Sequence, residues 1–372
     1  MPRGRRGAST GAIAAAVIII LIIIIGAAYY MAKGGGGTKT TTTTAGGVSG
    51  GTTTQSSPSP TTQAGKPYKI LILTGSTAGT YYPVGTAYAE LLNKYSNGAI
   101  NARALEGRAS VANIKDICSG VANAGLAQND ISYYAYHGTT IKDFQGHPQK
   151  CIRAVAVLYP ETIQIVVLAN SGINSLQDLA GKKVAVGAEG SGTYWNARQI
   201  LEAAGLWDKI VPEYKKFSEI VEDLKLGNID AAFLTAGIPT SAVEQLAAQV
   251  PVKIIPIPTE IYKELKQKYP FYTQVVIPKG TYNGVDQDVQ TVAVMSMLLV
   301  HKDVPKNVVY QMTKILFEHA DELKQKVQKQ SVQYISLKHA LEGLSIPLHP
   351  GAYQYYVEQG LNVPDQFKPP QG

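Results

Sequence analysis

Three turns rich in glycine and hydroxyl side chains are the parts of this chain whose composition best suits chemistry. They occupy residues 74–83, 106–110 and 187–193, and each lies between an apolar run and a helical pattern. Glycine lets the backbone approach a ligand, serine and threonine add hydroxyl groups, and the first turn of a helix offers free N–H groups to an anion. These turns are suited to holding a small carboxylate without covalent chemistry.

Catalytic and metal-binding patterns are poorly represented. The six histidines lack the HExxH motif and any paired i, i+4 spacing. Residues 190–192 lack the flanks of a nucleophile elbow, and no phosphate-loop lysine follows them. Residues 75–79 lack the third glycine of a dinucleotide fingerprint. We therefore expect no metal, no cofactor and no catalytic residue, and we interpret the chain as a binding protein rather than an enzyme.

The elements that position the three turns alternate between strands and helices after residue 67. Apolar runs predict strands at 68–74, 100–105 and 122–127, then at 152–158 and 163–169, with helices between the first three. The pattern restarts near residue 176, and a tail follows with a strand at 291–300 and one long helix at 307–328. Such alternation predicts an α/β protein with two doubly wound lobes, with crossings at 161–168 and near 255–262.

The two lobes predict a cleft, because ligands of open α/β sheets bind beyond the carboxyl ends of the strands. By position, the predicted ligand-binding residues are Ser76, Thr80, Tyr81, Ser110, Asn113, Gln128, Asp130, Tyr159, Glu161, Ser191, Gly192 and Thr193. We expect hydroxyl and N–H groups to hold the carboxylate of the solute, and Glu161 or Asp130 to meet an ammonium group. The alternatives are core packing for Tyr81, and hinge or loop hydrogen bonding for Glu161 and Asp130.

The net charge of +7 does not indicate nucleic-acid binding. Six of the 34 lysines and arginines, and no acidic residue, precede residue 67, so the remaining 28 face 27 acidic residues. No long basic run occurs elsewhere in the chain. The basic excess therefore belongs to the N-terminal segment.

That segment predicts a membrane anchor. Residues 8–28 carry no charge and follow Arg3, Arg5 and Arg6, and 21 residues of helix reach about 31 Å, which matches a bilayer core. The preceding positive charge places the N-terminus in the cytoplasm and the rest of the chain outside the cell. Cleavage of the segment as a signal is the alternative to its retention. Residues 6–9 resemble a prepilin-type signal, which would be cut after Gly7 and leave the helix attached, so we expect the helix to stay as an anchor. Residues 31–66, rich in Thr, Gly, Ser and Pro, predict a linker, either glycosylated or bare.

The chain contains only two cysteines, Cys118 and Cys151. Outside the cell they could form a disulfide, and two buried free thiols are the alternative.

Eight motifs together resemble the TAXI solute receptors of TRAP transporters. The first is Gly75-Ser76-Thr77-Ala78-Gly79-Thr80-Tyr81-Tyr82-Pro83-Val84-Gly85, and the others lie at 106–113, 127–130, 158–161, 178–187, 190–193, 227–233 and 346–352. The chain departs from the family in its first loop, which has fewer glycines, and at Arg108 and Ala109, which replace smaller residues.

The resemblance implies a periplasmic-binding-protein type II fold that closes on a glutamate- or glutamine-like amino acid or a dicarboxylate. It also implies a TRAP membrane permease as the partner that receives the solute. The corresponding organisation is an anchor at 1–30, a linker at 31–66, lobe 1 at 67–165, lobe 2 at 166–260, and a return to lobe 1 with C-terminal helices at 261–372. A ligand sensor acting on a separate membrane protein and, less favoured, an enzyme on the same fold are the competing functions.

Overall fold

The computed structural model describes residues 66–370. The predicted membrane segment and nearly all of the predicted linker lie outside these residues. Within residues 66–370, no helix combines the length and the apolar character needed to cross a membrane.

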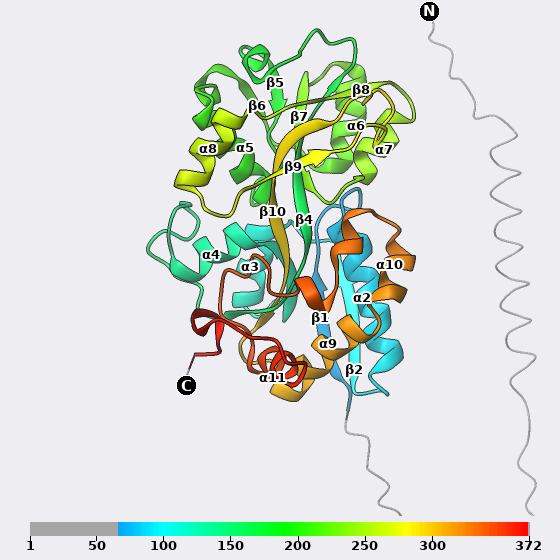
Figure 1. The fold of residues 1–372 in the computed structure, drawn as a ribbon, viewed down its shortest axis with the longest axis vertical. Helices are drawn as coiled ribbons and strands as arrows, with labels where there is room; N and C mark the ends of the chain where they lie inside the picture. Colours follow the sequence, from blue (N-terminus) through cyan, green and yellow to red (C-terminus); the bar gives the residue numbers. More distant parts are fainter. Residues whose placement is uncertain (1–65, 371–372) are drawn as a thin grey trace, which may run out of the picture. The chain divides into compact units, whose positions relative to one another are not determined.

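The described chain forms two α/β lobes that share one ten-stranded sheet (Figure 1). Its strands are β1 (Tyr68–Leu73), β2 (Ile100–Leu105), β3 (Ala124–Gln128), β4 (Ile152–Leu168), β5 (Lys183–Ala185), β6 (Val211–Glu213), β7 (Ala231–Ala236), β8 (Val252–Ile255), β9 (Thr273–Ile277) and β10 (Val289–His301). The order is β2-β1-β3-β10-β4-β7-β5-β6, with β8 paired to β4 and β9 to β10. The predicted α/β class with two lobes is confirmed.

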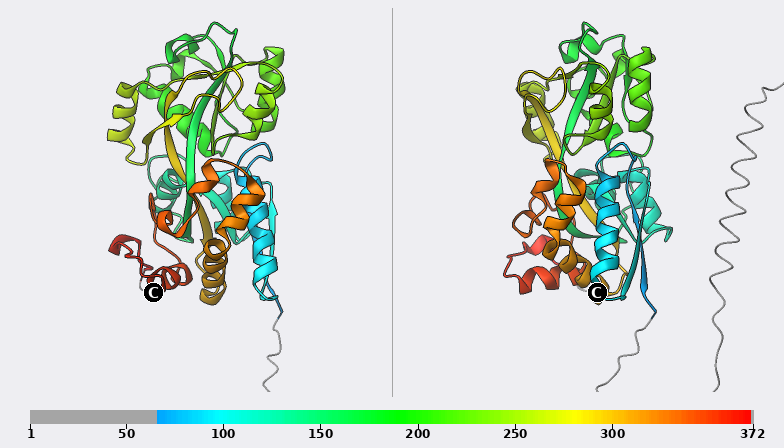
Figure 2. Two further views of the ribbon diagram at one scale, coloured as in Figure 1. Left: turned by 45° about the vertical axis from the view of Figure 1, so that its right-hand side comes forward. Right: turned by 90° about the vertical axis from the view of Figure 1, so that its right-hand side faces the viewer.

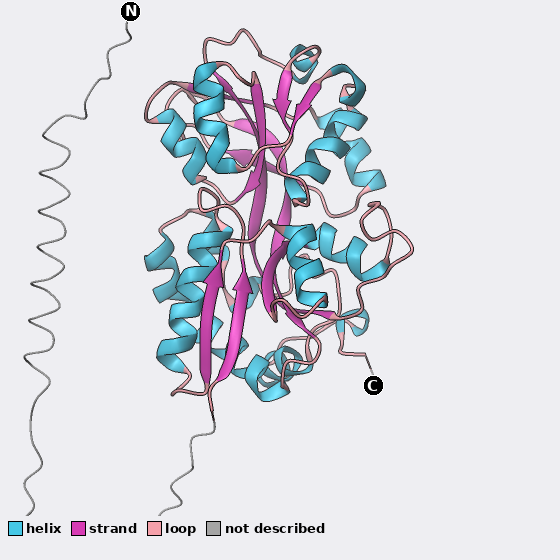
Figure 3. Ribbon diagram, turned by 180° about the vertical axis from the view of Figure 1, so that it is seen from behind, coloured by secondary structure: helices cyan, strands magenta, loops and turns pink. Residues whose placement is uncertain are grey.

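Helices cover both sides of the strands in each lobe (Figure 3). The first lobe carries α2 (Tyr81–Tyr95), α3 (Ser110–Cys118), α4 (Asn129–His137), α9 (Lys306–Glu318), α10 (Ala320–Val327) and α11 (Pro350–Glu358). The second carries α5 (Gly192–Ala203), α6 (Phe217–Leu226), α7 (Ser241–Ala247) and α8 (Thr259–Lys268).

In the second lobe, helices cover both faces of the sheet because apolar side chains of its strands alternate between the two faces. Val184 and Phe233 belong to the same apolar cluster as α5, whereas the neighbouring Ala185 and Leu234 belong to the cluster of α6 and α7. Successive side chains of a strand point to opposite faces, so both faces of β5 and β7 bury apolar surface. A strand buried on both faces reads as a continuous apolar run, as the sequence of β7 does.

Two long strands join the lobes (Figure 2). The N-terminal part of β4 pairs with β10 in the first lobe, and its C-terminal part pairs with β7 and β8 in the second. β10 likewise pairs with β3 in the first lobe and with β9 in the second. These strands hold together the walls of any cleft between the lobes.

Several predicted boundaries are wrong. The runs at 152–158 and 163–169 form one strand, β4. Pro160 does not interrupt it, because the pairing with β10 is irregular at this point and requires no N–H group from residue 160. The second crossing is β10 rather than residues 255–262, and the region after residue 261 first adds α8 and β9 to the second lobe. The helix predicted at 307–328 divides at His319, which stacks on Tyr95 of α2.

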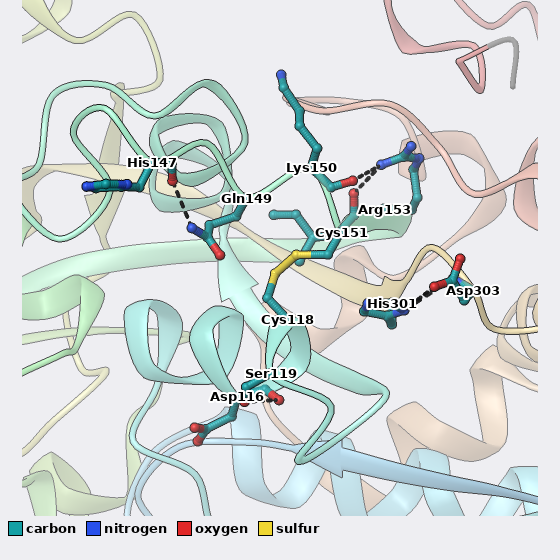
Figure 4. Close-up of a disulfide and its surroundings, with 11 residues drawn as sticks. Asp116, Cys118, Ser119, His147, Gln149, Lys150, Cys151, Arg153, His301 and Asp303 are labelled. Atoms are coloured by element: carbon teal, nitrogen blue, oxygen red, sulfur yellow. Dashed lines mark hydrogen bonds and ion pairs between the residues drawn. A yellow bond between two sulfur atoms is a disulfide. The ribbon is translucent and has the colours of Figure 1, made fainter.

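The two cysteines form a disulfide, which settles the alternative in favour of pairing (Figure 4). Cys118 ends α3 and Cys151 immediately precedes β4, with 5.5 Å between their Cα atoms. The bond therefore ties a helix of the first lobe to the strand that crosses into the second.

We expect reduction of this disulfide to lower the free energy of unfolding by about 3–4 kcal/mol, because it closes a loop of 33 residues in the unfolded chain. Urea denaturation with and without dithiothreitol measures the change. A Cys118→Ser, Cys151→Ser double variant serves as the control, since dithiothreitol should leave its midpoint where it is. A wild-type midpoint insensitive to reduction would contradict the expectation.

Candidate functional site

A cavity of about 450 Å³ lies between the two lobes. The first lobe contributes residues from the turns before α2 and α3, together with Gln128 at the end of β3. The second lobe contributes the turns before α5 and α6 and the end of β7. Glu161, in the crossing strand β4, also lines the cavity. A volume of this size suits a small organic molecule.

Four helices, α2, α3, α5 and α6, begin at this cavity. The first turn of each leaves N–H groups without partners inside the helix, and the helix dipole adds partial positive charge there. In α5 one of these groups is already used, because Ser191 Oγ accepts a hydrogen bond of 3.1 Å from the Tyr194 N–H. The remaining first-turn N–H groups can hold an anionic group of a ligand.

The turns approach each other closely where they meet. A Cβ atom at Gly192, the first residue of α5, would overlap the side chain of Gln128 in the other lobe. Ala109, just before α3, has a φ of 65° and a ψ of −160°, which is a conformation that favours glycine. Backbone strain of this kind is concentrated at ligand sites, and here it sets the entry of the chain into α3.

Glu161 is the most perturbed acid of the cavity. It is only 2% exposed, and its Oε2 accepts a hydrogen bond of 3.3 Å from Gln128 Nε2. Burial raises the pKa of Glu161 to about 8 from an ordinary value of 4.5, while the neighbouring Tyr81 and Gln128 limit the rise. Tyr81 lies near this carboxyl group, but its hydroxyl completes no hydrogen bond within the described residues.

Charged side chains of both signs line the outer part of the cavity. Arg108 lies 3.6 Å from Asp116, with a side chain 68% exposed, and Lys215 lies 3.1 Å from Asp223. Glu106 and Glu189 also contribute to the lining. Arg108 and Lys215 each have an acidic partner in their own lobe, so these two do not by themselves define an anion site, whereas Lys216, which also lines the cavity, forms no ion pair within the described residues.

Nine of the twelve residues predicted to bind ligand line this one cavity. They come from both lobes and from β4, and they are Ser76, Thr80, Tyr81, Ser110, Gln128, Glu161, Ser191, Gly192 and Thr193. Their contact with a ligand stays a prediction. The remaining three, Asn113, Asp130 and Tyr159, do not line the cavity.

Asn113 instead joins strands of the first lobe. Its side-chain amide donates to the backbone oxygens of Thr74, at 2.7 Å, and Leu126, at 2.9 Å. The side chain is fully buried between β1 and β3. Its position at the start of α3 is as predicted, but the helix turns this side chain toward the sheet.

Asp130 belongs to a buried network between the lobes rather than to the cavity wall. Its Oδ1 accepts from the Ile131 N–H at 2.8 Å, and its Oδ2 accepts from Asn196 Nδ2 of α5 at 3.0 Å. Asn196 also donates to the Tyr272 hydroxyl, at 3.0 Å. Burial raises the pKa of Asp130 to about 6. This arrangement agrees with the structural alternative for Asp130, which is hydrogen bonding at the junction of the lobes.

Tyr159 is fully buried in β4, and burial raises its pKa well above the usual range. Its hydroxyl has no hydrogen-bond partner within residues 66–370. Tyr159 thus lies beside the crossing as predicted, but behind the cavity lining.

Two further parts of the chain line the cavity and were not predicted from the sequence: the segment Tyr214-Lys215-Lys216-Phe217 and Thr235. The segment follows β6, a three-residue strand with little burial that produces no apolar run. Two lysines immediately before a helical pattern were the available signal. Thr235 sits inside a buried strand, where nothing in its neighbours distinguishes it.

The lobes contact each other directly around the cavity. Thr80 Oγ1 donates to the Gly237 oxygen at 3.0 Å, and the Ala112 N–H donates to the Gly190 oxygen at 3.2 Å. The Ala242 N–H also donates to the Ala78 oxygen at 3.0 Å. These bonds join loops of opposite lobes, so the structure has the lobes closed on the cavity.

The described part of the chain contains no cluster of three or more histidine, cysteine, aspartate or glutamate side chains that could hold a metal ion.

Comparisons with known proteins identify one family. The model of the NMT1-like family matches residues 72–360. Among solved structures, the chain is similar to the periplasmic aliphatic sulphonate binding protein SsuA from Escherichia coli, with 16% identity, 78% of this chain and 83% of that chain covered, and a TM-score of 0.41. It is also similar to a putative L-cystine ABC transporter from Listeria monocytogenes, with 16% identity, coverage of 72% and 98%, and a TM-score of 0.45. The likeness is distant in both cases.

Proposed function

The chain belongs to the NMT1-like family, and we propose that it is a receptor that captures a small carboxylate-bearing solute between its lobes for uptake through a membrane transporter. The solute would be an amino acid resembling glutamate or glutamine, or a dicarboxylate. The observation that carries this proposal is the cavity of about 450 Å³ at which four helices of two lobes begin. Turns of this composition bind and orient a ligand, and no set of groups for covalent catalysis accompanies them in the described residues.

The mechanism that we propose is capture without covalent chemistry. First-turn N–H groups of the helices and the hydroxyl groups of Ser76, Ser110 and Ser191 would hold the carboxylate. The rings of Tyr81 and Phe217 would cover the apolar part of the solute. The inter-lobe hydrogen bonds of Thr80 and Ala112 would form as the lobes close and exclude water.

The finer assignment, to the TAXI receptors of TRAP transporters, forms part of the same proposal. It is supported by the eight motifs, whose span nearly coincides with the family match at residues 72–360. The location is also proposed: a membrane anchor at residues 8–28 would hold the lobes outside the cell, so that captured solute reaches a permease in the same membrane.

A calorimetric and thermal-shift screen of the full chain tests this proposal. The screen would contain amino acids, dicarboxylates and keto acids. A true ligand at 100 times its Kd raises the free energy of unfolding by about 2.7 kcal/mol. The compounds should be recovered unchanged after incubation with the protein, and their chemical conversion would favour an enzyme instead. If no member of the screen binds, the proposed function is wrong.

A further inference from the structure

Four buried side chains that line the cavity share one feature, and we call them the floor cluster: Tyr81, Gln128, Glu161 and Thr235. All four line the cavity, and none is more than 8% exposed. They come from both lobes and from the crossing strand, on α2, β3, β4 and β7.

Each member of the floor cluster carries one buried polar atom that has no hydrogen-bond partner within the described residues. These atoms are Tyr81 Oη, Gln128 Oε1, Glu161 Oε1 and Thr235 Oγ1. All four are oxygens. The amide oxygen can only accept, as can the carboxyl oxygen once Glu161 is ionised, and the two hydroxyls can accept as well as donate. Because buried polar groups are normally paired, this wall is complementary to a ligand group that donates several hydrogen bonds at once.

The charge of the floor cluster points to the same ligand group. The groups that face Glu161 are Tyr81, Gln128, Ser296, Tyr159 and Asp130. The only other carboxylic acid among them is Asp130, which is buried as well, and no lysine, arginine or histidine within residues 66–370 forms an ion pair with Glu161. An ionised carboxylate buried without a cation is costly, so Glu161 favours its neutral form until a ligand brings a positive charge to it.

This inference rests on the proposed function, and it assigns the two ends of the solute to different parts of the cavity. We propose that the floor cluster is a subsite for a protonated amine, with Glu161 as its counter-ion, and that it selects amino acids over dicarboxylates that lack an amine. An ammonium group has three donors and no acceptor, which matches four unpaired oxygens. A second carboxylate placed there would bring another acidic group to a buried wall that holds no cation, and Gln128 Oε1 could not donate to it. The carboxylate of the solute then lies at the helix N-termini.

Proton release accompanies this mode of binding. With a pKa of about 8, Glu161 is mostly neutral at pH 7 before the solute arrives. The bound ammonium keeps its own proton and favours the carboxylate form of Glu161, so the carboxyl proton passes to the buffer. Binding of one amine-bearing solute at pH 7 is therefore expected to release close to one proton.

Matched pairs of solutes that differ only in the amine test the proposal on the full chain. The pairs are L-glutamate and glutarate, L-aspartate and succinate, and L-leucine and 4-methylpentanoate. Calorimetry should show the amine member of a bound pair binding on the order of 100-fold more tightly. Repeating the titration in phosphate and in Tris, whose ionisation enthalpies differ, measures the protons released.

Two variants localise the effect. Glu161→Gln keeps the shape of the side chain, and it should reduce the amine preference to within about tenfold and abolish proton release. Glu260→Gln, an exposed residue of α8, is the matched control and should change neither quantity. Denaturation curves of both variants verify that they are folded.

The outcomes separate this inference from the proposed function. If an amine-free member binds as tightly as its partner, or if Glu161→Gln keeps the full preference and the proton release, the amine subsite is wrong while the receptor function stands. If no member of any pair binds, both are wrong.

Discussion

The free energy of unfolding is expected to fall as the pH rises from 5 to 8, and Glu161→Gln is expected to remove most of that fall. Burial favours the neutral carboxyl group, so the folded state holds its proton up to a pKa of about 8, against an ordinary value of 4.5. The contribution of Glu161 to the free energy of unfolding is fully present below pH 4.5 and is lost as the pH rises toward 8. Each unit of pKa corresponds to 1.36 kcal/mol, so the free energy of unfolding lost through Glu161 reaches about 4 kcal/mol at pH 8 and stays below about 1 kcal/mol at pH 5.

Urea denaturation of the solute-free protein at pH 5 and pH 8 measures this effect. Glu161→Gln should be more stable than the wild type at pH 8, by several kcal/mol at most, and nearly equal to it at pH 5. The pKa of Asp130 is also raised. The free energy of unfolding of Glu161→Gln should therefore still fall between pH 5 and pH 8, but by less than that of the wild type. Glu260→Gln should follow the wild type. Equal stabilities of wild type and Glu161→Gln at pH 8 would show that Glu161 is not buried as an isolated acid.

Such a result has a functional meaning. Glu161 destabilises the fold at neutral pH and has no cationic partner within the described chain, and a bound ligand can offset that cost. Loss of affinity and gain of stability in the same variant are therefore two readouts of one arrangement.

Filling the cavity from its rim is expected to weaken solute binding by about 100-fold. Ser76 lines the cavity and is partly exposed, so a tryptophan there would occupy space that the solute needs without displacing the core. The solute would have to move the ring out of the cavity, and a cost of about 3 kcal/mol corresponds to about 100-fold in affinity, because each 1.4 kcal/mol is a factor of ten.

The adjacent Thr77 offers the matched control, because it is exposed and does not line the cavity. Calorimetry should find Ser76→Trp strongly impaired and Thr77→Trp close to the wild type. Both variants should unfold at the wild-type urea midpoint. Unchanged affinity in Ser76→Trp would place the solute outside this cavity.

The sequence predicted which turns line the site better than it predicted the direction of individual side chains. The turns before α2, α3 and α5 could be found because glycine and hydroxyl residues between a strand and a helix mark the carboxyl end of a parallel sheet. Whether a side chain of such a turn faces the cavity or the sheet depends on the rotation of the helix. In α3 this rotation turns the Asn113 side chain toward the sheet, where it donates to the backbone oxygens of Thr74 and Leu126.

The elements that escaped prediction share a physical cause. β6 is short and largely solvent-exposed, so it produces no apolar run, and the lysines that follow it carried no mark of a ligand site. The long helix predicted at 307–328 has a continuous amphipathic pattern across His319, and only its tertiary contact with Tyr95 identifies the break. The crossing through β10 depends on pairing between segments far apart in sequence, which local patterns do not report.

A crystal structure of the full chain with the solute that binds most tightly in the screen is the most direct test. We predict the solute between the lobes, with its carboxylate at the first turns of α3 and α5 and its other polar end against Glu161. Solute bound at any other surface, or lobes that enclose no solute when it is present at saturating concentration, would contradict the account.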